Sequence, residues 1–203
     1  MNPQFACFGY GSLVNDQTRH PRESRTIDCR LKGFRREWRA VTTREGPGHC
    51  ALSIRPDAGS EIDGVLVVEP TRKLPALDKR EAQYDRLALQ RTQLTLLRSD
   101  PLHAQLSKRA IVYRAKRVFR EWGSDRAPMM QSYVDVVMKG FLLRFGEAGL
   151  RRFMDTTDGW DQVPILADRK KPLYPRAVRL TGEEREFFHD LARDHGARFI
   201  STL

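Results

Sequence analysis

The sequence predicts a mixed α/β fold of the α+β kind. Segments with the apolar and β-branched character of strands fill much of residues 5–68, and two more follow at 90–98 and 110–115. Helical periodicity dominates only later, in an apolar stripe over residues 129–145 and in a terminal segment that opens with a capping-box pattern. Strands gathered before helices favour a mixed domain over a doubly wound sheet.

Length and composition indicate an ordinary globular chain. It has 203 residues, 40% of them hydrophobic and 31% charged, which suffices for one sizeable core. The sequence has no apolar run long enough to span a bilayer and no signal-peptide pattern, so we expect a cytoplasmic protein that uses no membrane. The three cysteines form no Cys-x-x-Cys pair and the histidines no His-Glu-x-x-His pattern. We therefore expect neither disulfides nor a metal site.

The first element is a short buried strand, Phe5–Phe8, which leads into the glycine loop Phe8-Gly9-Tyr10-Gly11-Ser12-Leu13. Gly9 and Gly11 lack a Cβ, so the main chain can turn sharply and a ligand can approach its N–H groups. Such a loop can bind a carboxylate or stabilise an oxyanion. An ordinary glycine turn after a strand is the alternative, and the spacing alone favours it.

A polar loop over residues 15–23 is expected next, followed by further strands. These strands are predicted over residues 26–30 and 34–41, interrupted at Gly33, and over residues 50–54 after the turn Gly46-Pro47-Gly48. Gly64-Val65-Leu66-Val67-Val68 is continuous and β-branched, which predicts the central strand of the sheet.

The strand region is also basic. Of the net charge of +10, residues 25–44 contribute +5, with seven basic and two acidic side chains. This basic run has three interpretations. It is a solvated strand surface, a surface that steers small anionic substrates, or a nucleic-acid interface in which Phe34 or Trp38 stacks on bases. The sequence has no RNP-like, zinc-finger or helix-turn-helix signature to support the third.

An acidic residue lies on the first helical pattern. Leu74, Leu77, Glu81 and Tyr84 are three or four residues apart, which places them on one face of a helix that starts near residue 71. Glu81 is then partly buried, where a carboxylate is costly unless it is partnered or protonated. The alternative is an ordinary surface ion pair with a nearby Lys or Arg, and periodicity does not separate the two.

The rest of the chain supplies strands, a connection and core helices. Residues 101–109 are expected to connect the strands at 90–98 and 110–115, and the apolar stripe of residues 129–145 is core material. Residues 151–176 contain a glycine and several prolines and are expected to be irregular. Thr181-Gly182-Glu183-Glu184 predicts the start of a terminal helix.

Three of these segments together resemble one known family. The loop Phe8-Gly9-Tyr10-Gly11-Ser12-Leu13 resembles the signature loop of the γ-glutamylcyclotransferase-like superfamily, and within it the glutathione-acting ChaC-like branch most of all. Residues 77–84 resemble the family's Leu-Asp-x-x-Glu segment, whose glutamate is the catalytic acid/base, and that role falls on Glu81. Residues 131–140 are similar to the family's helix that ends in a glycine and turns a tyrosine to the substrate, here Tyr133.

The resemblance spans roughly residues 5–141 and implies a fold and its organisation. It implies a small γ-glutamylcyclotransferase-like β-barrel with flanking helices, formed by residues 1–141. Residues 142–203, where no resemblance is found, are expected to be a C-terminal helical extension packed on the same domain.

The same resemblance implies an enzyme, a γ-glutamylcyclotransferase-type lyase or acyltransferase. It would release 5-oxoproline from a γ-glutamyl peptide such as glutathione by intramolecular amine attack, without metal or cofactor. The residues expected to bind this small-molecule substrate are Gly9, Tyr10, Gly11, Ser12, Leu13, Val14 and Tyr133. Which anion the N–H groups of Gly11, Ser12 and Leu13 would hold, the α-carboxylate or the oxyanion, stays open. The alternatives are a γ-glutamylamine cyclotransferase and a non-enzymatic member that binds nucleic acid through the basic surface, the latter less favoured because the acid is present.

Overall fold

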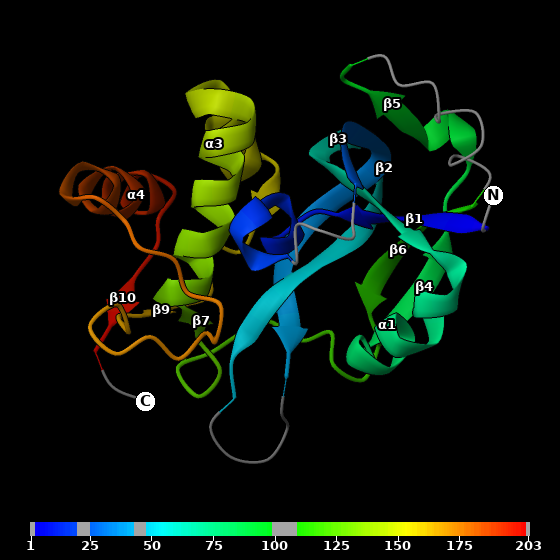
Figure 1. Ribbon diagram of the computed structural model, residues 1–203. Helices are drawn as coiled ribbons and strands as arrows, with labels where there is room; N and C mark the ends of the chain where they lie inside the picture. The colour runs from blue at the N-terminus through cyan, green and yellow to red at the C-terminus, as the bar shows by residue number, and fades with distance from the viewer. Residues whose placement is uncertain (1–2, 20–24, 43–47, 99–108, 202–203) are drawn as a thin grey trace.

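A computed structural model describes residues 3–19, 25–42, 48–98 and 109–201 (Figure 1). It confirms the mixed α/β fold: the described strands belong to one sheet, with helices packed beside it. The strands are β1 (Gln4–Gly9), β2 (Arg25–Val41), β3 (Cys50–Pro70), β4 (Tyr84–Ala88), β5 (Leu94–Leu96), β6 (Ala110–Ala115), β7 (Met129–Met130), β8 (Thr157–Asp158), β9 (Ile165–Leu166) and β10 (Phe199–Ile200). The α-helices are α1 (Leu74–Arg80), α3 (Gln131–Asp155) and α4 (Gly182–Asp194), and the short 3-10 turns are η1 (Ser12–Val14), η2 (Asp16–Thr18), η3 (Thr71–Lys73) and η4 (Arg91–Gln93).

The sheet is built on one long antiparallel ribbon of β2 and β3. Their pairing runs from Arg25 opposite Val68 to Val41 opposite Cys50. The predicted interruption at Gly33 is a bulge inside β2, where the register shifts and Gly33 has φ +81°. The predicted strands at 26–30 and 34–41 are therefore one strand. Gly46 and Pro47 of the predicted turn lie outside the described residues.

The predicted central strand is confirmed. Residues 65–68 of β3 pair with β2 on one side and with β1 on the other, Gly64 pairs with β2, and all five residues are buried. β1 in turn lies between β3, antiparallel, and β6, parallel. The glycine loop therefore leaves the middle of the sheet, at the end of a strand that is covered on both edges.

The sheet does not form the expected barrel. Its described strands follow the order β10-β9-β7-β3-β1-β6-β4, with β2 branching from β3, and this order has two open ends. Figure 1 shows α1, β4 and β6 at one end of the molecule, and α3, α4, β9 and β10 at the other. The chain after residue 142 adds β9 and β10 to the same sheet, and α3 runs across residues 141 and 142. The division into a domain of residues 1–141 and an extension stays a prediction.

The first helix is shorter than its apolar spacing predicts. α1 ends at Arg80, Glu81 caps it, and Tyr84 already belongs to β4. The reason is that β4 must start at Tyr84 to pair with β6, where Tyr84 lies opposite Ala115. Glu81 is thus held by a turn, in which its N–H donates to Leu77 O and its carbonyl accepts from Tyr84 N–H.

Two other predicted elements differ in extent. Only residues 94–96 of the segment 90–98 are a strand, since residues 91–93 form a 3-10 turn with a capping box between Gln90 and Gln93. The helix predicted at 129–145 is α3, which starts after the two residues of β7 and continues past a kink at Gly146 to Asp155. Residues 151–155 are therefore helical rather than irregular, because Phe153 and Met154 extend the buried face of the helix.

The loop after β1 is pressed against α3. Asn15 Nδ2 donates to Val136 O at 2.9 Å, and a Cβ added to Gly140 would lie 2.8 Å from the main-chain N of Asn15. At the far end of the chain the predicted capping box is confirmed, with Glu184 N–H donating to Thr181 Oγ1 at 3.1 Å. In the described part of the chain, the helices are too short or too polar to cross a bilayer.

Replacing Gly140 by alanine tests the contact between α3 and this loop. We expect Gly140→Ala to lower the free energy of unfolding by about 1–3 kcal/mol, because the new methyl group would collide with main-chain atoms that cannot move aside locally. Urea unfolding followed by circular dichroism measures it. The matched control is Gly182→Ala, where nothing lies within 4 Å of the added methyl group. Equal stability of the two variants would contradict the tight packing.

Candidate functional site

The glycine loop and the turn after α1 face each other across one pocket of about 100 Å³. The loop follows β1 in the middle of the sheet, and Glu81 lies at the C-terminal end of α1. The pocket is lined by Cys7, Phe8, Gly9, Tyr10, Gly11, Ser12, Leu13, Leu52, Leu77, Arg80, Glu81, Tyr84, Tyr113 and Tyr133. The structure thus brings together Gly9, Tyr10, Gly11, Ser12, Leu13, Glu81 and Tyr133, which are far apart in sequence.

Val14 is the exception among the predicted binding residues. Its side chain is only 1% exposed and lies in the hydrophobic core, not in the pocket. Its N–H donates to Gly11 O at 3.0 Å and closes the η1 turn, so its main chain is occupied as well. The structure therefore does not place Val14 with the other predicted binding residues, because the 3-10 turn η1 puts its side chain in the core.

The main chain of the loop is held so that three N–H groups stay unoccupied. The N–H groups of Gly11, Ser12 and Leu13 find no acceptor among the described residues, as expected at the start of a helical turn. A Cβ on Gly11 would lie 3.1 Å from Tyr133 Oη and 3.3 Å from Leu52 Cδ1, so a larger residue at this position would crowd these two side chains of the pocket. The loop is therefore an open set of main-chain donors beside Tyr133.

A buried arginine, which in the sequence stands only in the basic run, binds this loop from the side of the core. Arg36 is fully buried, and its Nε donates to Tyr10 O at 2.9 Å. It also donates to Thr156 Oγ1 at 2.9 Å and to Asp63 O. Its guanidinium lies 4.9 Å from the centre of the Phe141 ring. Burial lowers the pKa of Arg36 to about 9, which still leaves it cationic at neutral pH.

The bond from Arg36 sets the direction of the next peptide group. In a trans peptide the C=O and N–H point in opposite directions, and the described chain has no cis bond. Because Tyr10 O points to Arg36, the N–H of Gly11 points away from it.

Glu81 shows both features that its spacing left open, namely partial burial and an ion pair. Its side chain is 25% exposed, and its Oε1 accepts from Arg80 Nε at 2.9 Å. It is therefore partly buried and also paired with a neighbouring arginine. Glu81 and Arg80 are the only acidic and basic side chains among the residues that line the pocket.

The other polar side chains of the pocket are neutral donors. Burial raises the pKa of Tyr10, Tyr84 and Tyr133 above their usual range, so these residues keep their O–H at neutral pH. Tyr10 Oη donates to Tyr113 O at 2.8 Å. Burial also raises the pKa of Cys7 to about 12, so its sulfur is a thiol and a poor nucleophile.

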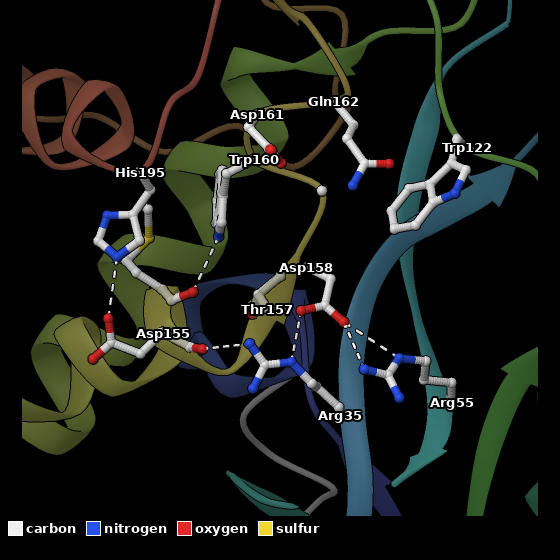
Figure 2. A pocket seen from close by; sticks show the side chains of 12 residues that line it. Arg35, Arg55, Trp122, Asp155, Thr157, Asp158, Trp160, Asp161, Gln162 and His195 are labelled. Carbon is white, nitrogen blue, oxygen red and sulfur yellow. Dashed lines mark hydrogen bonds and ion pairs between the residues drawn. The ribbon is translucent and has the colours of Figure 1, made fainter.

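A second, larger pocket of about 590 Å³ lies elsewhere on the molecule (Figure 2). Its centre is Asp158, which accepts from Arg35 at 2.6 Å and from Arg55 at 3.0 Å. At its side His195 Nε2 lies 3.2 Å from Asp155 Oδ1. These charges satisfy one another, and the pocket contains none of the predicted site residues. Its size therefore does not make it the better candidate.

Fold and site together define a mixed α/β protein in which a glycine loop faces one carboxylate across a small pocket. Comparison with protein-family models and with curated proteins finds no match. Comparison with solved structures does. A γ-glutamyl cyclotransferase superposes with a TM-score of 0.58 at 14% identity, over 93% of this chain and 99% of that one.

Two further structures share the fold. An uncharacterised human protein gives a TM-score of 0.53 at 15% identity and covers 92% of this chain and 98% of its own. The YkqA protein of Bacillus subtilis gives 0.54 at 15% identity, over 75% of this chain and 53% of that one. The chain thus has the γ-glutamyl cyclotransferase-like fold, and the resemblance found in the sequence is confirmed at the level of the fold.

Exchanging Arg36 for methionine tests its place in the site. Methionine keeps much of the apolar stem, but Tyr10 O, Asp63 O and Thr156 lose their donor. We expect Arg36→Met to lower the free energy of unfolding by about 2–4 kcal/mol, since buried acceptors are left unpaired. Arg35→Met is the control: Arg35 is partly exposed and pairs with Asp158, so the expected loss is only about 0–1 kcal/mol. Urea unfolding compares the two, and similar losses would argue against this role of Arg36.

Proposed function

We propose that this protein is a γ-glutamyl cyclotransferase that releases 5-oxoproline from γ-glutamyl peptides, with Glu81 as the general acid/base. The observation that carries the proposal is the position of Glu81 across one small pocket from the unoccupied N–H groups of Gly11, Ser12 and Leu13. The shared fold with a γ-glutamyl cyclotransferase supports the same chemistry.

The reaction needs little more than positioning and one proton carrier. The α-amine of the γ-glutamyl group attacks its own side-chain carbonyl, so a new C–N bond closes the five-membered ring and the old amide C–N bond breaks. Glu81 takes the proton that the attacking amine loses and gives it to the departing nitrogen. Both nitrogens are bonded to the same carbon in the intermediate, so one carboxyl can reach both.

The glycine loop supplies the anion site. Its three N–H donors suit either the substrate's α-carboxylate or the oxyanion that forms at the γ-carbonyl. Arg36 donates to Tyr10 O, and the N–H of Gly11 in the same peptide group therefore points away from Arg36. Because the donors are fixed before substrate binds, they need no reorganisation during the reaction.

The remaining lining fits a γ-glutamyl group. Phe8, Leu52 and Leu77 give apolar walls for the methylene carbons, and Tyr133 gives a neutral hydroxyl beside the loop. The volume of about 100 Å³ suits the γ-glutamyl part, with the leaving part of the substrate directed outward.

The nucleic-acid alternative has less support. Arg36 is fully buried, Arg30 pairs with Asp63 at 2.7 Å, and Arg35 pairs with Asp158 at 2.6 Å. These side chains of the basic run are engaged in contacts within the protein and are not free to bind phosphates. Arg44 of the run lies outside the described residues.

The variant Glu81→Gln tests the proposal. We expect it to bind γ-glutamyl substrates but to release 5-oxoproline roughly a hundred- to ten-thousandfold more slowly, because the amide cannot carry the proton. The assay offers glutathione, a γ-glutamyl dipeptide and a γ-glutamylamine and quantifies 5-oxoproline by mass spectrometry.

The control for this assay is Glu186→Gln, which alters an exposed carboxylate on α4 and should leave the rate unchanged. Turnover by Glu81→Gln at the wild-type rate would rule out Glu81 as the acid/base. Release of 5-oxoproline from the γ-glutamylamine alone would identify a γ-glutamylamine cyclotransferase.

A further inference from the structure

Arg80 is the one basic side chain among the residues that line the site pocket. It comes directly before Glu81 in the chain, and its Nε lies 2.9 Å from Glu81 Oε1. Its side chain is 54% exposed, so it lies at the mouth of the pocket rather than in its depth. The rest of the lining offers an incoming anion neutral hydroxyl, thiol and main-chain groups, but no second cation.

The acidic side chain nearest in sequence to this pair already has partners. Asp78, two residues before Arg80, accepts from Arg86 Nη1 at 2.6 Å and from Tyr113 Oη at 2.6 Å. It therefore does not compete with Glu81 for Arg80. The protein without substrate thus keeps one ion pair at the pocket, formed by the proposed acid/base and a neighbouring arginine.

This ion pair is easily exchanged. It joins adjacent residues at the end of a short helix and is open to solvent, and such pairs contribute little to stability. A guanidinium binds a carboxylate best through two parallel N–H donors. The contact with Glu81 uses Nε alone, so a carboxylate that could accept from two donors would bind Arg80 in a better geometry.

We propose that Arg80 selects substrates whose leaving part carries a carboxylate, and that it passes from Glu81 to that carboxylate when the substrate binds. This inference rests on the proposed function. Glu81 must reach the departing nitrogen, and in a γ-glutamyl dipeptide the terminal carboxylate follows that nitrogen by a single residue, within about 3.6 Å of chain. Arg80, in contact with Glu81, therefore lies within reach of it.

The exchange also frees one oxygen of the acid/base. While Arg80 donates to Oε1, the attacking amine has only Oε2 as a partner that is not engaged by the guanidinium. A γ-glutamyl peptide releases Oε1 by supplying its own carboxylate, whereas a γ-glutamylamine without a carboxylate leaves the pair in place. The same arginine thus favours the binding of peptides over that of simple amines.

A pair of matched substrates tests this inference, namely γ-glutamylalanine and its C-terminal amide. We expect the wild type to prefer the free acid by roughly 10- to 100-fold in kcat/KM, the effect of one charge-assisted bidentate contact. In Arg80→Gln this preference should fall to near one, and Arg80→Lys should keep an intermediate preference because it retains the charge without the planar fork. Lys79→Gln removes the neighbouring exposed charge and should keep the wild-type preference.

The outcomes separate the two proposals. An active wild type that treats acid and amide alike, or an Arg80→Gln variant that keeps the full preference, would overturn the role of Arg80 and leave the proposed function intact. If no variant and no substrate yields 5-oxoproline, the proposed function fails. In that case calorimetry still tests the role of Arg80. The wild type must bind the free acid more tightly than the C-terminal amide, and this difference in affinity must disappear in Arg80→Gln.

Discussion

The bond from the buried Arg36 guanidinium to Tyr10 O is the contact on which the site depends. It joins the glycine loop to β2, and the same side chain reaches β3 through Asp63 O and the end of α3 through Thr156. A cation buried without a carboxylate in direct contact is costly, and here three oxygen acceptors and two aromatic faces offset that cost. The loop is therefore tied to the core behind it through Arg36, which suits a preorganised anion site.

The opposite wall of the site follows from strand pairing. α1 has to end before Tyr84, because that residue must pair with Ala115 of β6. The turn between helix and strand holds Glu81 with its side chain in the pocket. The acid and the donors thus adjoin two strands, β4 and β1, which pair with opposite edges of β6, so their separation is set by the sheet.

Local sequence predicted the parts of the site that form a motif, and tertiary packing decided the rest. The glycine loop, Glu81 and Tyr133 could be found because each stands in a recognisable segment. In the sequence Arg36 stands only in a basic run, since no local pattern shows that its partner is a carbonyl 26 positions earlier. The helical period of four apolar or acidic positions predicts a helical Tyr84, because periodicity cannot show where pairing with another strand ends the helix.

The most direct measurement is a crystal structure of the Glu81→Gln variant with a bound γ-glutamyl dipeptide. The account predicts that one anionic oxygen of the ligand accepts from the N–H groups of Gly11, Ser12 or Leu13, while Tyr10 O remains bonded to Arg36 and the scissile nitrogen lies beside the side chain at position 81. A dipeptide bound in the larger pocket around Asp158, or with its γ-amide turned away from position 81, would contradict it.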